Sequence, residues 1–248
     1  MKRLHFGVLV FPGSNGDHDC LYLLNDVLRV RAEEVWHEET RLAGYDCLIL
    51  PGGFAYGDYL RCGAIARFSP VMRPLRDYAA AGGPVLGICN GFQILTEAGL
   101  LPGALLRNAE LAFSCRYVHL RVEPGARSNP FTEGVSGGAV WRLPIAHGEG
   151  RYFADTETLA QVEANRQVVL RYCDGGGELT AESNPNGSSN NIAGICNTAG
   201  NVLGLMPHPE RAGEALIGGD DGLYIFRSLI AACGAADLRA LPAAGPAR

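Results

Sequence analysis

The stretch PVLGICNGFQIL, residues 84–95, decides how this chain is expected to fold. An apolar run leads into Cys89, and a helix-like run follows it. Gly87 and Gly91 flank the cysteine, which gives the pattern G-x-C-x-G of a nucleophile elbow, a sharp turn from a strand into a helix. Small residues are expected there because larger side chains would crowd the turn. The stretch therefore predicts a strand that ends at an accessible, reactive thiol.

The same alternation of strand and helix extends through the first half of the chain. Apolar runs typical of buried strands alternate with helical patterns, and glycine or proline separates them. The strands are expected near residues 4–10, 33–36 and 46–50, and the helices near residues 20–28 and 70–81. Continuous apolar strands that alternate with helices indicate a parallel sheet covered by helices on both faces.

The second half is rich in strands, expected near residues 116–123, 139–150, 167–174, 191–197 and 201–210. A helix near residues 220–233 follows them. We therefore predict an α/β, flavodoxin-like fold whose mostly parallel central sheet carries an antiparallel or mixed extension. Residues 1–234 are expected to form a single domain, and the low-complexity residues 235–248 a flexible tail.

Composition excludes several classes of protein. The chain has 248 residues, 47% of them hydrophobic and 19% charged, which is ordinary for a soluble globular protein. A net charge of −5 without basic runs argues against nucleic-acid binding, and no apolar stretch is long enough to span a membrane. The eight cysteines include no C-x-x-C pair, and the six histidines no H-E-x-x-H pattern. We expect a cytoplasmic protein with reduced thiols and no metal.

A nucleophilic cysteine needs a base, and the segment LMPHPER at residues 205–211 offers one. His208 lies between two prolines at the end of an apolar strand, and Glu210 follows it. In an extended chain these two side chains would lie on the same side, so the carboxylate could orient the imidazole.

A third segment, PGG at residues 51–53, also follows an apolar strand. Its backbone amides could help to form an oxyanion hole with the amide of Asn90. The helix after Cys89 directs its positive end at the sulfur, which favours the thiolate. All three segments end strands, so we expect them to meet at one rim of the sheet.

These motifs, together with HGEGRY at residues 147–152 and NPNGS at residues 184–188, resemble those of the class I, triad-type glutamine amidotransferases. Within that family the chain is most similar to glutaminase subunits that serve a separate synthetase of purine biosynthesis. The similarity covers about residues 50–211 and the N-terminal segment. Ala55 stands where that pattern has serine.

The resemblance implies that Cys89 is the nucleophile, His208 the general base and acid, and Glu210 its orienting partner. It implies that Gly53 and Asn90 supply the oxyanion-hole amides. The residues expected to bind glutamine or support its pocket are Gly52, Gln93, Phe113, Arg116, His147 and Glu149. For His147 and Glu149, a contact with the partner subunit or a purely structural turn are the alternatives.

The resemblance also implies a reaction and its partners. Glutamine would be hydrolysed to glutamate and ammonia through a cysteine thioester. The ammonia would pass to an ATP-dependent synthetase that converts formylglycinamide ribonucleotide to formylglycinamidine ribonucleotide. This chain contains no G-x-x-x-x-G-K-[ST] phosphate loop. ATP and magnesium are therefore expected on a large synthetase subunit that a small accessory subunit accompanies, and no cofactor on this chain.

Three alternatives stay open at this point. A glutaminase that serves a different synthetase would share the triad, but HGEGRY and NPNGS argue against it. A cysteine peptidase or esterase of the same fold would not need Gln93, and it would be distinguished by having no activity on free glutamine. A non-catalytic flavodoxin-like binding module would not need the histidine and glutamate at residues 208 and 210.

Overall fold

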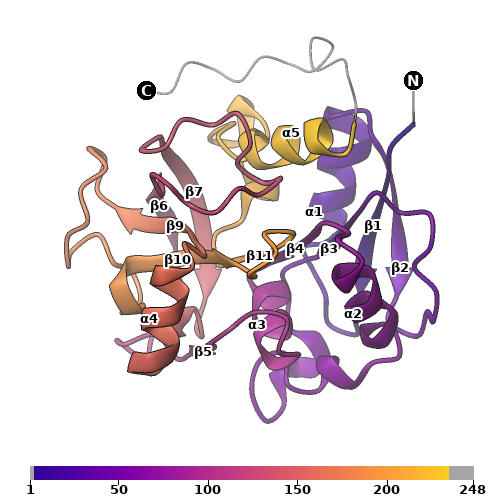
Figure 1. Ribbon diagram of the computed structural model, residues 1–248, viewed down its shortest axis with the longest axis horizontal. Helices are drawn as coiled ribbons and strands as arrows, with labels where there is room; N and C mark the ends of the chain where they lie inside the picture. The colour runs from indigo at the N-terminus through magenta and orange to yellow at the C-terminus, as the bar shows by residue number, and fades with distance from the viewer. Residues whose placement is uncertain (1–2, 235–248) are drawn as a thin grey trace.

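The computed structural model describes residues 3–234. The expected tail at residues 235–248 lies outside the described residues. One nine-stranded sheet runs through the molecule in the order β2-β1-β3-β4-β11-β10-β9-β6-β7 (Figure 1). The first five strands in this order are β2 (Arg31–Trp36), β1 (His5–Val10), β3 (Cys47–Leu50), β4 (Val85–Ile88) and β11 (Val202–Leu205). The other four are β10 (Ile192–Cys196), β9 (Val168–Cys173), β6 (Ser114–Val122) and β7 (Val140–His147).

The sheet is mixed, as predicted. The five strands from β2 to β11 are parallel to one another, and every pairing from β11 to β7 is antiparallel. The last of these strands in sequence, β11, lies between the parallel part and the extension. It pairs antiparallel with β10 and parallel with β4, with Val202 opposite Val85 and Leu205 opposite Ile88. The chain beyond β11 and the chain beyond β4 therefore emerge side by side.

Helices cover both faces of the parallel part (Figure 1). On one side lie α1 (Asp17–Tyr22), which continues as a π-helical turn over Leu23–Val27, and α5 (Leu223–Ala232). On the other side lie α2 (Met72–Ala80) and α3 (Asn90–Glu97). The prediction of a sheet with helices on both faces is confirmed.

Three elements were not expected from the sequence. Helix α4 (Thr156–Ala164) begins after Asp155, whose side chain accepts a hydrogen bond from the amide of Thr158. Val162 is its buried residue, so its apolar periodicity is weak. The strands β5 (Ala104–Leu106) and β8 (Arg151–Phe153) pair in a separate small sheet, and each is too short to give a clear pattern.

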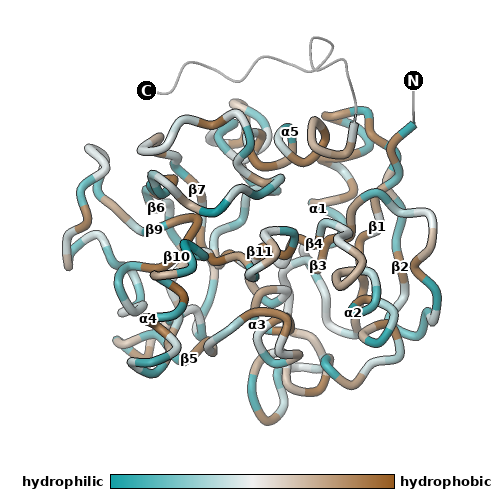
Figure 2. The backbone as a smooth tube through the Cα atoms, in the orientation of Figure 1, coloured by the Kyte–Doolittle hydropathy of each residue, from teal (hydrophilic) through white to brown (hydrophobic). Residues whose placement is uncertain are grey.

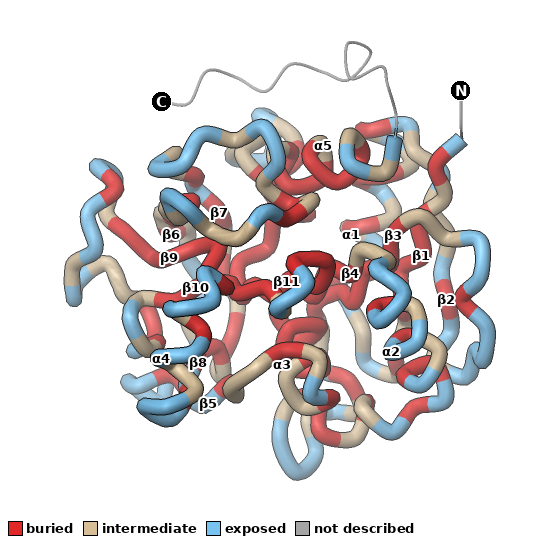
Figure 3. Tube along the Cα trace, viewed as in Figure 1, coloured by how far each residue is buried: buried red, intermediate tan, exposed pale blue. Residues whose placement is uncertain are grey.

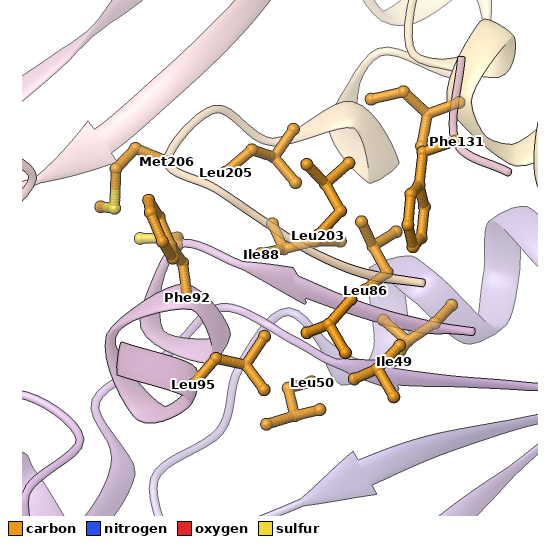
Figure 4. Close-up of a cluster of buried hydrophobic side chains, with 14 of the residues drawn as sticks. Ile49, Leu50, Leu86, Ile88, Phe92, Leu95, Phe131, Leu203, Leu205 and Met206 are labelled. Atoms are coloured by element: carbon orange, nitrogen blue, oxygen red, sulfur yellow. The ribbon is translucent and has the colours of Figure 1, made fainter. Parts of the chain in front are cut away.

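One part of the hydrophobic core lies between the parallel strands and α3, and the core continues on the other face against α1 and α5. Apolar and buried segments coincide along the central strands (Figures 2 and 3). Phe92 and Leu95 of α3 point toward the side chains of β3, β4 and β11 (Figure 4). Gly204 of β11 lies so close to Phe92 that a Cβ atom there would come within 2.1 Å of the ring. This close packing holds the N-terminus of α3 against the ends of the central strands.

Among residues 3–234, no helix combines the length and the apolar character that crossing a membrane requires.

Candidate active site

Cys89 lies at the turn between β4 and α3 with φ 50° and ψ −102°, a backbone conformation that L-residues rarely adopt. A Cβ atom on Gly91 would lie 2.0 Å from the carbonyl oxygen of Leu50, and one on Gly87 would lie 2.4 Å from Cδ1 of Leu95. The two glycines predicted at the elbow are therefore required because α3 packs closely on β3 and β4. Crowding of the sulfur itself is not the main reason.

Neighbouring strands fix the position of Cys89. Its amide donates to the carbonyl of Leu205 on β11 at 2.8 Å. Its thiol lies 3.8 Å from the carbonyl oxygen of Ala146 on β7. The side chain is mostly buried, with 6% of its surface exposed, and α3 begins at the next residue. The thiol thus sits at the positive end of a helix.

His208 and Glu210 form a buried pair. Nδ1 of His208 lies 2.6 Å from Oε1 of Glu210 and donates its proton to that oxygen, and the amide of His208 donates to the carbonyl of Pro144. The expected extended conformation is wrong, because Pro209–Arg211 form a 3-10 turn. This turn, rather than strand alternation, returns the carboxylate to the imidazole.

Two opposing effects act on His208. Burial alone lowers its pKa, but the charge of Glu210 and the interaction with Cys89 outweigh burial and raise the pKa to about 10. Nε2 of His208 is buried and has no hydrogen-bond partner within residues 3–234. At neutral pH the imidazole therefore carries a proton on both nitrogens, with Nδ1 bound to Glu210 and Nε2 left for a group that enters the site.

The PGG loop reaches both residues. A Cβ atom on Gly52 would lie 2.8 Å from Cε1 of His208 and 3.7 Å from Cβ of Cys89. The carbonyl of Gly52 accepts hydrogen bonds from the amides of Asn15 and Gly16. The three predicted segments therefore meet at one rim of the sheet, and only glycine leaves enough space at position 52.

Side chains of the elbow contact the loops around it. Oδ1 of Asn90 accepts from the amide of Ala55 at 3.1 Å, and Nδ2 donates to Oε1 of Gln93 at 2.9 Å. Nε2 of Gln93 donates to the carbonyl of Glu149 at 2.6 Å. Both ends of the Gln93 amide are thus engaged within the protein. The residue at position 55 takes part through its backbone, so alanine serves there.

The remaining residues predicted from the sequence lie in two places. The His147–Glu149 loop borders the elbow through Gln93, and Phe113, 57% exposed, lies against Gly148 of this loop. Arg116 is exposed and lines a different cavity, of about 320 Å³, with His119, Cys173 and others. The expected supporting role of Arg116 stays a prediction.

Sequence reasoning missed polar residues around the elbow. Asp58 lies 3.4 Å from Nδ2 of Asn90, and burial, together with the charge of Glu149, raises the pKa of its carboxyl. The thiol of Cys62 hydrogen-bonds to Asp58 and Glu149, and burial raises its pKa, as do these carboxylates. Asn108 binds the His147–Gly150 segment. In the sequence they appear only as polar residues in loops, and this pattern is too common to identify them as part of a site.

His147 gives a prediction for the pH dependence of stability. Burial and the charge of His208 lower the pKa of His147 to about 4, and its Nε2 finds no partner within residues 3–234. The folded state therefore favours the neutral imidazole of His147. This contribution to the free energy of unfolding is fully present above the pKa of the unfolded state, about 6.5. It is lost as the pH falls toward 4, by up to about 3 kcal/mol.

Chemical unfolding measured between pH 7 and 4 checks this expectation. His147→Gln should flatten the loss of unfolding free energy over that range, because it removes the titrating group. The exposed His18, changed to Gln, is the matched control and should leave the slope as it is. An unchanged slope in His147→Gln would contradict the prediction.

One group of side chains within residues 3–234 has the arrangement of metal ligands. Ligand atoms of Asp17, His18 and Glu34 lie within 4.8 Å of one another. Asp17 is buried, whereas the other two are exposed, and the group lies on α1 and β2 rather than on the loops of the triad. Exposed acidic groups of this kind are common without an ion. The expectation of a metal-free site stays a prediction.

Comparison with known proteins agrees with this architecture. Residues 3–218 match the family described as a CobB/CobQ-like glutamine amidotransferase domain. The phosphoribosylformylglycinamidine synthase subunit PurQ of Moorella thermoacetica is 59% identical over 92% of this chain and 95% of its own length. PurQ of Thermosynechococcus vestitus is also 59% identical, over 93% of this chain and 98% of its own.

Solved structures give the same result. A chain of the PurLQS structure from Thermotoga maritima matches with a TM-score of 0.80 and 42% identity, over 93% of this chain and 99% of that one. A glutamine amidotransferase of the same organism matches with a TM-score of 0.53 and 14% identity, over 94% of this chain and 83% of that one, and so supports the fold alone. This chain belongs to the CobB/CobQ-like glutamine amidotransferase family and, within it, to the PurQ subunits of phosphoribosylformylglycinamidine synthase.

Proposed function

We propose that this chain releases ammonia from glutamine with Cys89, His208 and Glu210 as its catalytic triad. The observation that carries the proposal is the position of His208. Its Nδ1 is hydrogen-bonded to Glu210 at 2.6 Å, and its Cε1 packs on Gly52, which lies next to Cys89. This is the arrangement of a nucleophile, a base and an orienting acid.

In the first half of the reaction, the Cys89 thiolate attacks the side-chain carbonyl carbon of glutamine. The negative charge that develops on the oxygen is stabilised by the amides of Gly53 and Asn90, each worth about 3 kcal/mol of barrier. His208, protonated because its pKa is raised, donates a proton from Nε2 to the amide nitrogen. The carbon–nitrogen bond breaks, ammonia leaves, and a thioester remains on Cys89.

In the second half, the neutral His208 removes a proton from water, and the hydroxide attacks the thioester. The tetrahedral intermediate collapses, the carbon–sulfur bond breaks, and glutamate leaves. The sulfur leaves as a thiolate and His208 keeps the proton taken from water, so the pair that began the reaction is restored. Glu210 keeps the imidazole oriented in both directions and balances its positive charge.

We further propose that the ammonia passes to a synthetase on a separate chain that makes formylglycinamidine ribonucleotide with ATP and magnesium. The similarity to a chain of the PurLQS structure supports a large synthetase subunit and a small accessory subunit as partners. We propose a cytoplasmic location as well, since many free thiols suit a reducing compartment.

The proposal predicts that the isolated chain is a poor glutaminase that its partners activate. The PGG loop contains two adjacent glycines, so its productive conformation can be a minor population in the free subunit. A partner that binds the productive conformation better by about 1.4 kcal/mol raises a rare population tenfold.

Glutamine hydrolysis by the purified chain should therefore rise strongly when the synthetase subunit, the accessory subunit, nucleotide and acceptor ribonucleotide are added. The readout is glutamate formed per active site. Full activity of the isolated chain, unchanged by these additions, would show a free-standing glutaminase instead. No hydrolysis of glutamine under any of these conditions would refute the proposed function.

A further inference from the structure

We propose that Asn108 and Asn186 are positioning residues that keep the oxyanion hole in shape by fixing the backbone at Glu149 and Gly150. This inference rests on the proposed glutaminase activity. It assigns a role to the motif NPNGS, which contains Asn186 and takes no part in the triad. One chain of hydrogen bonds runs from these two asparagines to the elbow.

The peptide group between Glu149 and Gly150 is held at both ends. Its carbonyl oxygen accepts from Nε2 of Gln93 at 2.6 Å, and its N–H donates to Oδ1 of Asn108 at 3.0 Å. Asn108 is buried and also binds the ring and the carbonyl of His147. A peptide held by two buried side chains cannot rotate without breaking a hydrogen bond that water would not replace.

Asn186 fixes the next peptide group. Its Nδ2 donates to the carbonyl oxygen of Gly150 at 2.8 Å. Its Oδ1 accepts from the amide and the hydroxyl of Ser188, at 3.0 and 2.7 Å. Only 2% of Asn186 is exposed, so this amide is itself immobilised by the loop that carries it.

Close packing removes the remaining freedom of this segment. A Cβ atom on Gly150 would lie 2.3 Å from Nδ1 and Cε1 of His147, so the backbone rests directly on the ring. The ring is bound in turn to Asn108 at 3.0 Å. Gly150 is therefore held between an imidazole and two asparagines.

Gln93 transmits this fixed position to the elbow. Its Oε1 accepts from Nδ2 of Asn90 at 2.9 Å, and Oδ1 of Asn90 accepts from the amide of Ala55 at 3.1 Å. Asn90 and Gly53 carry the proposed oxyanion donors, and Ala55 belongs to the same loop as Gly53. The chain of bonds thus ends on both sides of the oxyanion hole.

The expected effect is on kcat rather than on KM. Oxyanion donors bind the charge that forms in the transition state, and the ground-state amide needs them little. Loosening the donors therefore lowers kcat while the KM for glutamine changes by less than about twofold. For Asn186→Ala we expect kcat to fall about tenfold, because small displacements of catalytic groups are costly.

The experiment uses the assembled complex with the synthetase and accessory subunits, and measures kcat and KM for glutamine. The variants are Asn186→Ala, Gln93→Ala and the double variant. If Asn186 acts through Gln93, then Asn186→Ala lowers kcat by less than about twofold once Gln93 is alanine. Activity with ammonium as the nitrogen source stays at the wild-type level in all three variants.

A second variant and a matched control separate positioning from general stability. Asn186→Asp keeps the bonds to Ser188 but loses the donor to Gly150, and the same fall in kcat is expected. Asn201, a buried asparagine that donates to the carbonyls of Ala79 and Gly83, is the control. Asn201→Ala should lower the unfolding temperature without changing kcat.

The inference is overturned if the effects of Asn186→Ala and Gln93→Ala on kcat simply multiply. It is also overturned if Asn186→Ala and Asn186→Asp leave kcat unchanged, or if Asn201→Ala lowers kcat equally. A wild-type complex that uses ammonium but not glutamine would refute the proposed function instead.

Discussion

Replacing Cys89 with alanine is expected to abolish glutamine-dependent synthesis by the complex and to leave ammonium-dependent synthesis intact. The substitution removes the nucleophile but leaves the synthetase subunit untouched, so only the source of ammonia is lost. A fall in glutamine hydrolysis of at least about a thousandfold is expected, as for other catalytic nucleophiles. Both activities are measured on the same preparation, with glutamine or ammonium chloride as the nitrogen donor.

Cys115 offers the matched control for this experiment, because it is exposed on β6. Cys115→Ala should keep glutamine hydrolysis near the wild-type rate. If Cys89→Ala hydrolysed glutamine at a rate near that of Cys115→Ala, the nucleophile would have to be another group. A loss of ammonium-dependent synthesis in Cys89→Ala would instead indicate damage to the complex.

The second large effect concerns His208 and Glu210. His208→Ala should be nearly as severe as Cys89→Ala, because members of a catalytic unit do not contribute additively. Glu210→Gln should be milder by about tenfold or more, since the amide oxygen can still accept the proton of Nδ1. The substitution also removes the charge that raises the pKa of His208, so the ionisation of His208 should move to lower pH.

Profiles of kcat against pH for the wild type and Glu210→Gln test this assignment. Burial lowers the pKa of His208, and without the carboxylate the largest opposing effect is gone, so the corresponding limb of the profile shifts toward acid. An identical profile in both proteins would mean that Glu210 does not act on His208. A loss of activity in Glu210→Gln greater than that in Cys89→Ala would reverse the roles of the two residues.

The elbow and the parallel sheet could be predicted from the sequence because their signals are local. Glycines beside Cys89 mark a turn that bulkier residues cannot form, and apolar runs between glycine loops mark buried strands. The pair His208 and Glu210 could also be found, although the reason given for their contact was wrong. The extended chain that the spacing favours is replaced by a 3-10 turn at Pro209–Arg211, which local alternation does not reveal.

The surroundings of the triad could not be predicted because they depend on contacts distant in sequence. Asn108, Gly150 and Asn186 come together only when three loops pack, and no spacing between them carries a signal. The place of Arg116 could not be predicted for a similar reason. The resemblance implies that it supports the site, but no pattern in the sequence indicates that, from β6, it lines a cavity with His119 and Cys173.

The position of β11 in the middle of the sheet affects how the protein folds during its synthesis on the ribosome. The strand that leads to His208 fills the gap between β4 and β10, yet among the strands of residues 3–234 it is translated last. Until it emerges, the nascent chain carries Cys89 without its base and exposes two strand edges that invite pairing with other chains. A chain terminated before β11 would therefore be inert and prone to aggregate. Catalytic competence and a closed sheet arrive together, once β11 and His208 have been made.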